Sequence, residues 1–151
     1  MKKTAVAARA VVRDSDYRSL AEFRHHIRRY LEFSDRSART AGLEPQQYQL
    51  LLALKGLPES DTPTVGALSS QLRVRHHSAV ELIDRAERNG LVRRTRYGSA
   101  VMVGLSRKGE RLLERVVAKR LKELHVAGPA LVDALQKLIA RRAKSKTKRD
   151  K

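Results

Sequence analysis

Residues 68–92 constrain the fold of this chain more than any other segment. Apolar residues recur in them at helical spacing in two short runs, separated by Arg73-Val74-Arg75, so one side of each run can face a core. The second run ends at Asn89-Gly90, where both residues tolerate the left-handed conformation of a helix C-terminus. Two helices joined by a turn of three or four residues, the second with a polar outer face, are typical of a DNA-reading helix-turn-helix. A plain helical hairpin in an all-α domain fits this segment equally well, so the flanking sequence has to decide.

After Gly90 the helical spacing of apolar residues gives way to strand-like segments. This change distinguishes a helix-turn-helix from a plain helical hairpin. Residues 91–96 and 100–105 have the composition of two strands around a turn at Tyr97-Gly98-Ser99. A β-hairpin directly behind a helix-turn-helix is the wing of a winged helix. Thr62-Pro63-Thr64 could form a further, very short strand, after which Thr64 would cap the next helix. We therefore predict a mainly α fold with a small β-hairpin wing.

Long amphipathic helices flank this module. One is expected to begin between Ser15 and Ser19 and to end near residue 41; the other begins at Ser106 and is expected to break at Gly128-Pro129 before a last helix. Their apolar stripes exceed what a small winged helix can cover, so we expect a symmetric dimer with interlocked ends. Two recognition helices would then meet successive major grooves about 34–36 Å apart, on an inverted repeat.

Four regions are expected along the chain. They are a basic N-terminal arm at residues 1–14, a helical dimerisation region at residues 15–43 and 107–140, a winged helix-turn-helix lobe at residues 44–106, and a basic disordered tail at residues 141–151. The arm is either disordered or folded as extra helix against a partner subunit.

The charge of the chain indicates a polyanionic partner. Lys and Arg number 33 against 16 Asp and Glu, which gives a net charge of +17. Self-repulsion of this size would be unfavourable without such a partner, and nucleic acid is a better candidate than an anionic membrane surface. The absence of cysteine excludes disulfides, thiolate metal sites and cysteine nucleophiles. Arg9 and Arg13 interrupt the signal-like start and no apolar run is long enough to span a membrane, so the sequence predicts a cytoplasmic protein.

The order of the elements and four stretches of sequence resemble the MarR family of winged helix-turn-helix transcription regulators. The stretches are Gly42-Leu43-Glu44-Pro45-Gln46-Gln47-Tyr48, Val65-Gly66-Ala67-Leu68, Val80-x-Leu82-Ile83-Asp84-Arg85-x-Glu87-x-x-Gly90-Leu91-Val92, and Leu105-Ser106-x-x-Gly109. The resemblance covers about residues 20–140. It implies an α-helical dimer with one DNA-binding lobe per subunit, and a repressor of the kind that small, frequently aromatic anionic ligands release.

The sequence departs from the family pattern at three places. The wing usually carries an Asp-Arg-Arg run, and here Tyr97-Gly98-Ser99-Ala100 stands in that region, which puts minor-groove insertion by the wing tip in doubt. Arg73 occupies a turn position that is usually Gly. Arg75 replaces the usual Ser or Thr cap, which should weaken the cap by roughly 0.5–2 kcal/mol while adding positive charge.

Candidate DNA contacts gather at the start of the second helix and on the first strand of the wing. His76, His77 and Ser78 occupy positions from which side chains reach base edges, with solvent exposure or phosphate contact as the alternative. Glu81 could accept from a cytosine amino group or pair with Arg85, and we favour the pair. The residues expected to neutralise phosphates are Arg73, Arg75, Arg85, Arg93, Arg94 and Arg96.

Other chemistry has less support in the sequence. A ligand pocket would lie where the first and second helices meet the winged lobe, with His26, Tyr30 and Tyr48 as lining residues, although packing in the core explains them at least as well. Adjacent histidines point about 100° apart on a helix with no carboxylate close by, so we expect no metal and no cofactor. Asp84 and Glu87 are expected to orient neighbouring arginines rather than act as acids. No nucleophile–base arrangement or phosphate loop is evident, and we expect no enzyme activity.

These observations favour a homodimeric, sequence-specific, double-stranded DNA-binding regulator. We expect it to repress an inverted-repeat operator and to be released by a small aromatic or anionic ligand. The alternative is an architectural or non-specific nucleic-acid-binding protein that is driven by the basic ends of the chain.

Overall fold

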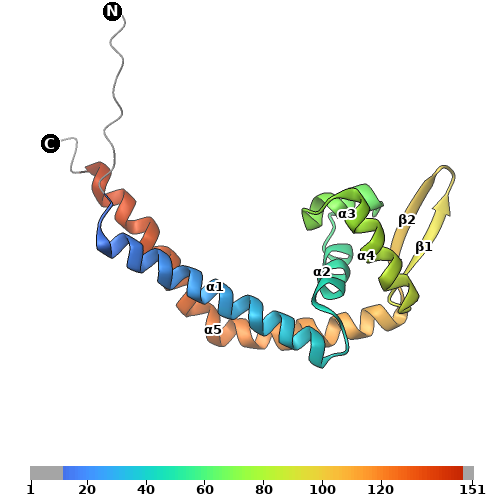
Figure 1. Cartoon of the computed structure of the whole chain (residues 1–151), viewed down its shortest axis with the longest axis horizontal. Helices are drawn as coiled ribbons and strands as arrows, with labels where there is room; N and C mark the ends of the chain where they lie inside the picture. Colours follow the sequence, from blue (N-terminus) through green and yellow to red (C-terminus); the bar gives the residue numbers. More distant parts are fainter. Residues whose placement is uncertain (1–11, 148–151) are drawn as a thin grey trace, which may run out of the picture. The chain divides into compact units, whose positions relative to one another are not determined.

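The computed structural model describes residues 12–147, with side chains described as far as residue 140, and it divides into two compact units. The first unit contains residues 12–30 and 125–147, and the second is Leu31–Leu124. In chain order the elements are α1 (Asp14–Thr40), α2 (Pro45–Lys55), α3 (Val65–Leu72), α4 (His76–Arg88), β1 (Val92–Tyr97), β2 (Ala100–Leu105) and α5 (Arg107–Thr147), as Figure 1 shows. The prediction of a mainly α fold with a two-stranded hairpin is confirmed.

The first unit consists of the N-terminal part of α1 and the C-terminal part of α5. The carboxylate of Asp16 accepts a hydrogen bond from the backbone N–H of Arg13 at 2.9 Å, which helps to start α1 at Asp14. Lys137 on α5 lies 3.8 Å from the carboxylate of Glu22 on α1 and 2.9 Å from that of Asp133. In the described part of this unit, Ala134 is the one residue of α5 that is buried. Residues 1–11, which form most of the predicted basic arm, lie outside the described part of the chain.

Helix α5 differs from its prediction at two places. It continues through Pro129, where a break was expected, and it extends to Thr147, seven residues into the predicted disordered tail. Pro129 removes only one backbone donor, and Gly128 before it has no Cβ to meet the pyrrolidine ring, so the helix can continue. Strong helix formers, mainly Ala, Arg and Lys, occupy residues 140–147. Residues 148–151 of the tail are outside the described part.

The second unit holds the main hydrophobic core. Its largest fully buried side chains come from the α1–α2 connection, α2, α3, α4, both strands and the start of α5: Leu43, Leu50, Leu51, Leu68, Ile83, Val92, Val103 and Val116. Helix α2 begins with Pro45, and the side-chain oxygen of Gln47 accepts from the backbone N–H of Glu44 at 3.2 Å. No described helix is both long and apolar enough to cross a membrane.

The predicted helix-turn-helix is formed by α3 and α4. Thr64 caps α3 by accepting a hydrogen bond from the backbone N–H of Ala67 at 3.2 Å. Arg73 ends α3 in the left-handed conformation with a φ of 54°, and it is the one non-glycine residue with positive φ in the described part. Arg75 precedes α4 without a side-chain cap, as its chemistry predicts. Gly90, with a φ of 70°, terminates α4.

The wing is a two-stranded antiparallel hairpin with Tyr97 opposite Ala100. Its two-residue turn has Gly98 at a φ of 60° and Ser99 at negative φ, the pattern of a type II′ turn. The short strand expected at Thr62-Pro63-Thr64 is not formed, because Pro63 has no N–H with which to build a ladder. Its carbonyl nonetheless accepts a hydrogen bond from the backbone N–H of Val103 at 2.8 Å, which ties the wing to the start of α3.

The Leu-Ser-x-x-Gly stretch closes the base of the wing. The backbone N–H of Ser106 donates to the carbonyl of Leu91 at 2.9 Å, and its hydroxyl donates to the carbonyl of Gly90 at 2.6 Å. The same hydroxyl accepts from the backbone N–H of Gly109 at 3.0 Å and so caps α5. A Cβ at Gly109 would lie 2.1 Å from the carbonyl oxygen of Leu91, so only glycine allows this close approach. Ser106, through its hydrogen bonds, and Gly109, through its lack of a Cβ, therefore hold both ends of the hairpin against the start of α5.

Candidate nucleic-acid interface

Helix α4 presents one buried and one exposed face. Ala79, Leu82, Ile83 and Ala86 are buried, with Ile83 fully inaccessible, and they fix the helix against the core. The opposite face holds several candidates for contact with bases: His76, His77 and Glu81 are exposed, and Ser78 is half-buried. The structure therefore brings the predicted base-reading residues together on one surface of one helix.

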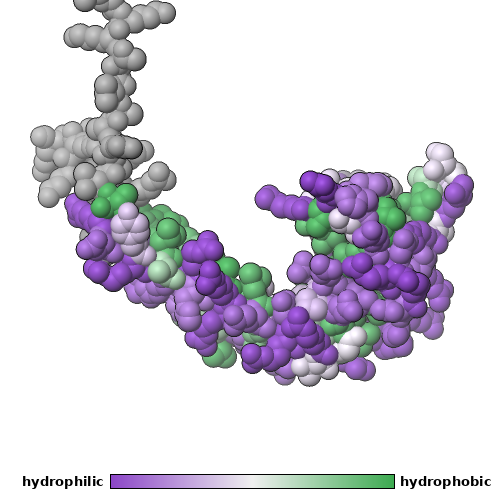
Figure 2. All heavy atoms as spheres, viewed as in Figure 1, coloured by the Kyte–Doolittle hydropathy of each residue, from purple (hydrophilic) through white to green (hydrophobic). Residues whose placement is uncertain are grey.

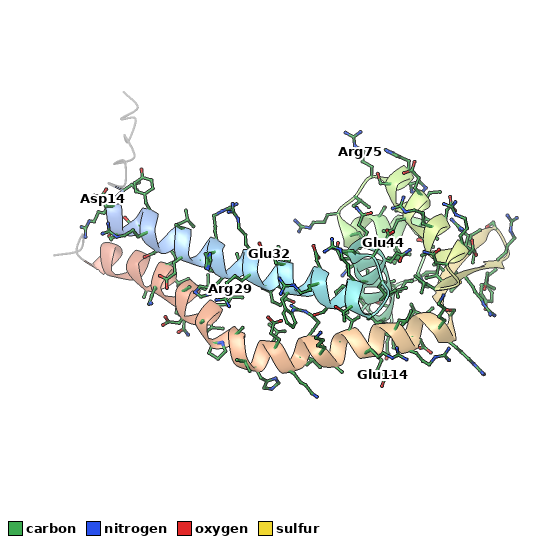
Figure 3. All side chains as sticks on the ribbon, turned by 60° about the horizontal axis from the view of Figure 1, so that its bottom comes forward. Asp14, Arg29, Glu32, Glu44, Arg75 and Glu114 are labelled. Carbon is green, nitrogen blue, oxygen red and sulfur yellow. The ribbon has the colours of Figure 1, made fainter. Side chains whose placement is uncertain are left out.

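Arg73 and Arg75 flank the start of α4. Both side chains are exposed, and Figure 3 shows that of Arg75 directed away from the second unit. Because Arg75 supplies no acceptor, no side chain caps the first backbone N–H groups of α4. Two cations and an uncapped helix N-terminus at one place favour the approach of an anion such as a DNA phosphate.

Arg94 of the wing pairs with two carboxylates of α4. Its guanidinium lies 2.5 Å from both Asp84 and Glu87, and its backbone N–H donates to Glu87 at 3.0 Å. That backbone hydrogen bond, helped by the guanidinium, lowers the pKa of Glu87. Partial burial opposes the charge of Arg94, but the two carboxylates outweigh it and raise the pKa of the guanidinium. Asp84 and Glu87 orient an arginine, as predicted.

This network makes Arg94 the least available of the candidates for phosphate contact. Its side chain is 25% exposed and both carboxylates hold its guanidinium. The two ion pairs fix the wing to α4 and leave little of this guanidinium free for a phosphate. Arg93 and Arg96, the neighbouring candidates on β1, are exposed.

Arg85 joins two helices instead of pairing within α4. Its guanidinium donates to the side-chain oxygen of Gln46 on α2 at 3.1 Å. The expected Glu81–Arg85 pair is not among the ion pairs of the described residues, so that prediction is wrong. Helical spacing placed the two residues within reach, but the nearby amide of Gln46 takes the arginine. Glu81 remains exposed on the polar face of α4.

A second group of cations lies at the base of the wing. Arg93, Arg107 and Lys108 line a depression together with Gly90, Leu105 and Ser106. The ammonium of Lys108 donates to the carbonyl of Asn89 at 2.9 Å, which fixes its position. Arg107 and Lys108 were not predicted, although they are adjacent basic residues one position after the second predicted strand.

The three candidate ligand-binding residues fall in different units. Tyr48 is 8% exposed and belongs to the hydrophobic core of the second unit, which agrees with the alternative that it packs in the core. His26 and Tyr30 are half-buried in the first unit. The rings of His25 and His26 lie 6.0 Å apart, edge to face. No group of three or more potential metal ligands occurs in the described part of the chain.

The fold and the exposed face of α4 define a winged helix-turn-helix protein. Residues 41–98 match the model of the MarR family. A MarR family protein from Bacillus stearothermophilus is 28% identical with a TM-score of 0.64, and the match covers 93% of this chain and 98% of that one. The resemblance to the MarR family at residues 41–98 is therefore confirmed.

More distant solved structures share the fold. AbsC, a MarR family transcriptional regulator from Streptomyces coelicolor, is 17% identical with a TM-score of 0.70, covering 94% of this chain and 99% of that one. The M. tuberculosis transcriptional regulator MOSR, solved in complex with DNA, is 20% identical with a TM-score of 0.57, covering 82% of this chain and 94% of its own. No curated protein matches the chain by sequence. Both AbsC and MOSR are described as transcriptional regulators.

Proposed function

We propose that this protein is a sequence-specific, double-stranded DNA-binding transcription regulator that acts as a homodimer and represses from an inverted-repeat operator. The observation that carries the proposal is the exposed polar face of α4, with His76, His77 and Glu81 accessible while the opposite face is buried. A helix fixed in this way can enter a major groove without rearrangement of its core. MOSR, which has the same fold, was solved in complex with DNA.

The distribution of charge supports a duplex as the partner. Arg73 and Arg75 lie beside the N-terminus of α4, and Arg93 and Arg96 lie on the wing, all exposed. Cations on both sides of a groove-binding helix meet the two phosphate backbones that border the groove. Release of counterions from several phosphates would give affinity that falls steeply with salt.

Exposed apolar side chains in the first unit support the dimer. Val132, Leu135 and Ile139 of α5 repeat at spacings of three and four, and they are 52%, 41% and 62% exposed. Leu20 of α1 is 51% exposed, and Figure 2 shows hydrophobic residues at the surface of these helices. An apolar stripe of this length is unfavourable in water unless another surface covers it. A second copy of the chain would cover it with its own equivalent stripe and would supply the second recognition helix.

Selection of bound duplexes from a random DNA pool tests the proposal. We expect an enriched inverted repeat whose half-sites lie about 10 base pairs apart, centre to centre, or a multiple of that distance. Binding to the enriched duplex should exceed binding to random DNA by about 10³ or more. A ratio that never exceeds about tenfold would contradict sequence-specific regulation. Analytical ultracentrifugation of the free protein should show a dimer, and a monomer would contradict the homodimer.

Release by a small aromatic or anionic ligand is a separate part of the proposal. The family resemblance supports it, with His26, Tyr30 and Tyr48 as the candidate residues. A ligand that favours one spacing of the two DNA-binding lobes would shift the population of DNA-competent dimers. Titration of aromatic acids into the complex with the selected duplex should lower the affinity. An affinity that no ligand changes would indicate a constitutive DNA-binding protein.

The high net charge favours a second candidate, an architectural or non-specific nucleic-acid-binding protein. The chain has a net charge of +17, and residues 141–151 include seven Lys and Arg. Deletion of residues 141–151 separates the two functions. For a regulator, the deletion should lower affinity for all DNA about equally and leave the ratio of specific to random binding unchanged. For an architectural protein, no such ratio would exist before or after the deletion.

A further inference from the structure

The depression at the base of the wing gathers three cations. Arg93 lies near the start of β1, and Arg107 and Lys108 begin α5. All three side chains are exposed, and none of them belongs to an ion pair of the described residues. The ammonium of Lys108 is nonetheless fixed, because it donates to the carbonyl of Asn89 at 2.9 Å. Positive charges held together without a counter-charge repel one another, and a bound anion removes that repulsion.

The carboxylates close to the depression in sequence are occupied by other cations. Glu110, in the first turn of α5, pairs with Lys55 of α2 at 3.0 Å. Asp84 and Glu87 of α4 both hold Arg94. An anion from outside the chain is therefore the counter-charge that this arrangement favours.

The shape of the depression fits a small ligand. Its volume is about 520 Å³, within the range of about 300–1,000 Å³ that is typical of small-molecule sites. Gly104, the cross-strand partner of Arg93, has no side chain, and a Cβ there would meet nothing within 4 Å, so the space beside Arg93 on this face of the hairpin is open. Half-buried Leu105 adds an apolar surface. Arginine meets phosphate oxygens with paired donors and lysine adds a point charge, so the lining residues suit a chain of phosphates.

The depression lies at the opposite end of α4 from the candidate base-reading residues. Its residues contact the C-terminal end of α4, through Lys108 with Asn89 and through the hydroxyl of Ser106 with Gly90 at 2.6 Å. His76 begins the other end of the helix, whose 13 residues span about 20 Å. Figure 1 shows the base of the wing and the start of α5 beside the end of α4 and far from its start. A duplex read by the start of α4 therefore leaves the depression accessible.

We propose that the base of the wing binds a di- or triphosphate anion, free or as part of a nucleotide, at a site separate from the DNA surface. Such a ligand carries several negative charges along its length and can meet all three cations at once, whereas a single sulfate ion meets fewer of them. It bridges Arg93 of the wing to Arg107 and Lys108 of α5 and so restrains the base of the hairpin. The site does not depend on the proposed function, because all its residues belong to one chain and it needs no duplex.

Titration calorimetry of sodium triphosphate into the full-length protein, at constant ionic strength, tests the proposal. Wild type should bind one triphosphate per chain more tightly than any further ones. Arg93→Ala and Arg107→Ala should each weaken this binding about tenfold, the effect of about one charge-assisted hydrogen bond. Sulfate should bind at least about tenfold more weakly than triphosphate, and equal affinities would contradict a phosphate-chain site. ATP separates the two sources of the ligand, since tighter binding than triphosphate identifies a nucleotide and equal binding identifies the phosphate chain alone.

Arg115→Ala is the matched control, because Arg115 is an exposed arginine of α5 that does not line the depression. It should keep the wild-type affinity for triphosphate. Thermal unfolding of the three variants without ligand should match wild type, since none of these arginines belongs to an ion pair of the described residues. Binding that survives both Arg93→Ala and Arg107→Ala, or that Arg115→Ala weakens equally, overturns the proposal.

Duplex binding distinguishes this site from a contact with the DNA backbone. Arg107→Ala should leave the salt dependence of duplex binding unchanged. A slope against salt that falls by about 0.9 would make the depression a contact for a DNA phosphate and would also overturn the proposal.

Discussion

Substitution of Gly109 by alanine should destabilise the protein, although alanine is the better helix former. Alanine in place of glycine in a helix contributes about 1 kcal/mol of stability by propensity. At Gly109, however, the new Cβ would lie 2.1 Å from the carbonyl oxygen of Leu91, and the obstacle is backbone. The first turn of α5 would have to move by about 1 Å, with an overpacking cost of about 1–3 kcal/mol. The shift would also weaken the hydrogen bond from the backbone N–H of Ser106 to Leu91, worth about 1 kcal/mol.

The net expectation is a loss of about 1–3 kcal/mol in the free energy of unfolding, when propensity, overpacking and the weakened hydrogen bond are combined. Urea unfolding followed by circular dichroism measures it, with all variants at one protein concentration because association adds to apparent stability. Gly66→Ala is the matched control, since Gly66 also lies in the first turn of a helix and its Cβ would meet only the Thr64 hydroxyl at 3.9 Å. That variant should be neutral or more stable. A Gly109→Ala protein as stable as wild type would refute the reasoning.

Three further outcomes are expected. Arg73→Gly should raise the free energy of unfolding by about 1 kcal/mol, because Arg73 has a φ of 54° that glycine adopts freely; an unchanged urea midpoint would contradict the assigned strain. Glu87→Gln should lower stability at pH 7 by at most about 1 kcal/mol, since the carboxylate is partly exposed. The folded pKa of Glu87 lies below 4.5, so this difference should be present above that pH and disappear as the pH falls through the folded pKa, which acid titrations of both proteins would detect. Ile139→Glu should shift the dimer towards monomer in sedimentation, whereas Ala140→Glu should not, because Ala140 is exposed but points about 100° away from Ile139 on the same helix.

The local elements were predictable because each depends on nearby residues. The cap at Thr64, the stop at Gly90 and the limits of β2 follow from residue types within a few positions of one another. The buried and exposed faces of α4 follow from the spacing of its apolar residues. The same local logic identified Arg75 as a position that lacks a cap acceptor.

Long-range partners were beyond this kind of reasoning. Arg85 was expected to pair with Glu81, but its acceptor is Gln46, which is 39 residues away in the sequence. Arg94 was expected to contact phosphate, and only the packing of the wing on α4 shows that it is the arginine held by Asp84 and Glu87. The depression lined by Arg93, Arg107 and Lys108 requires the wing to bring its two ends together. Pro129 was read as a break because local rules give proline more weight than the helix formers around it.

The uncapped start of α4 has a consequence for the dynamics of the free protein. The backbone N–H groups of His76, His77 and Ser78 have no side-chain cap, while that of Ala79 is already bonded to the carbonyl of Arg75 at 3.0 Å. The first turn should therefore fray on its own, and its amide hydrogens should exchange with solvent much faster than those around Ile83. A bound phosphate would supply the missing acceptor, so exchange of these amide hydrogens should slow when the helix N-terminus binds a duplex.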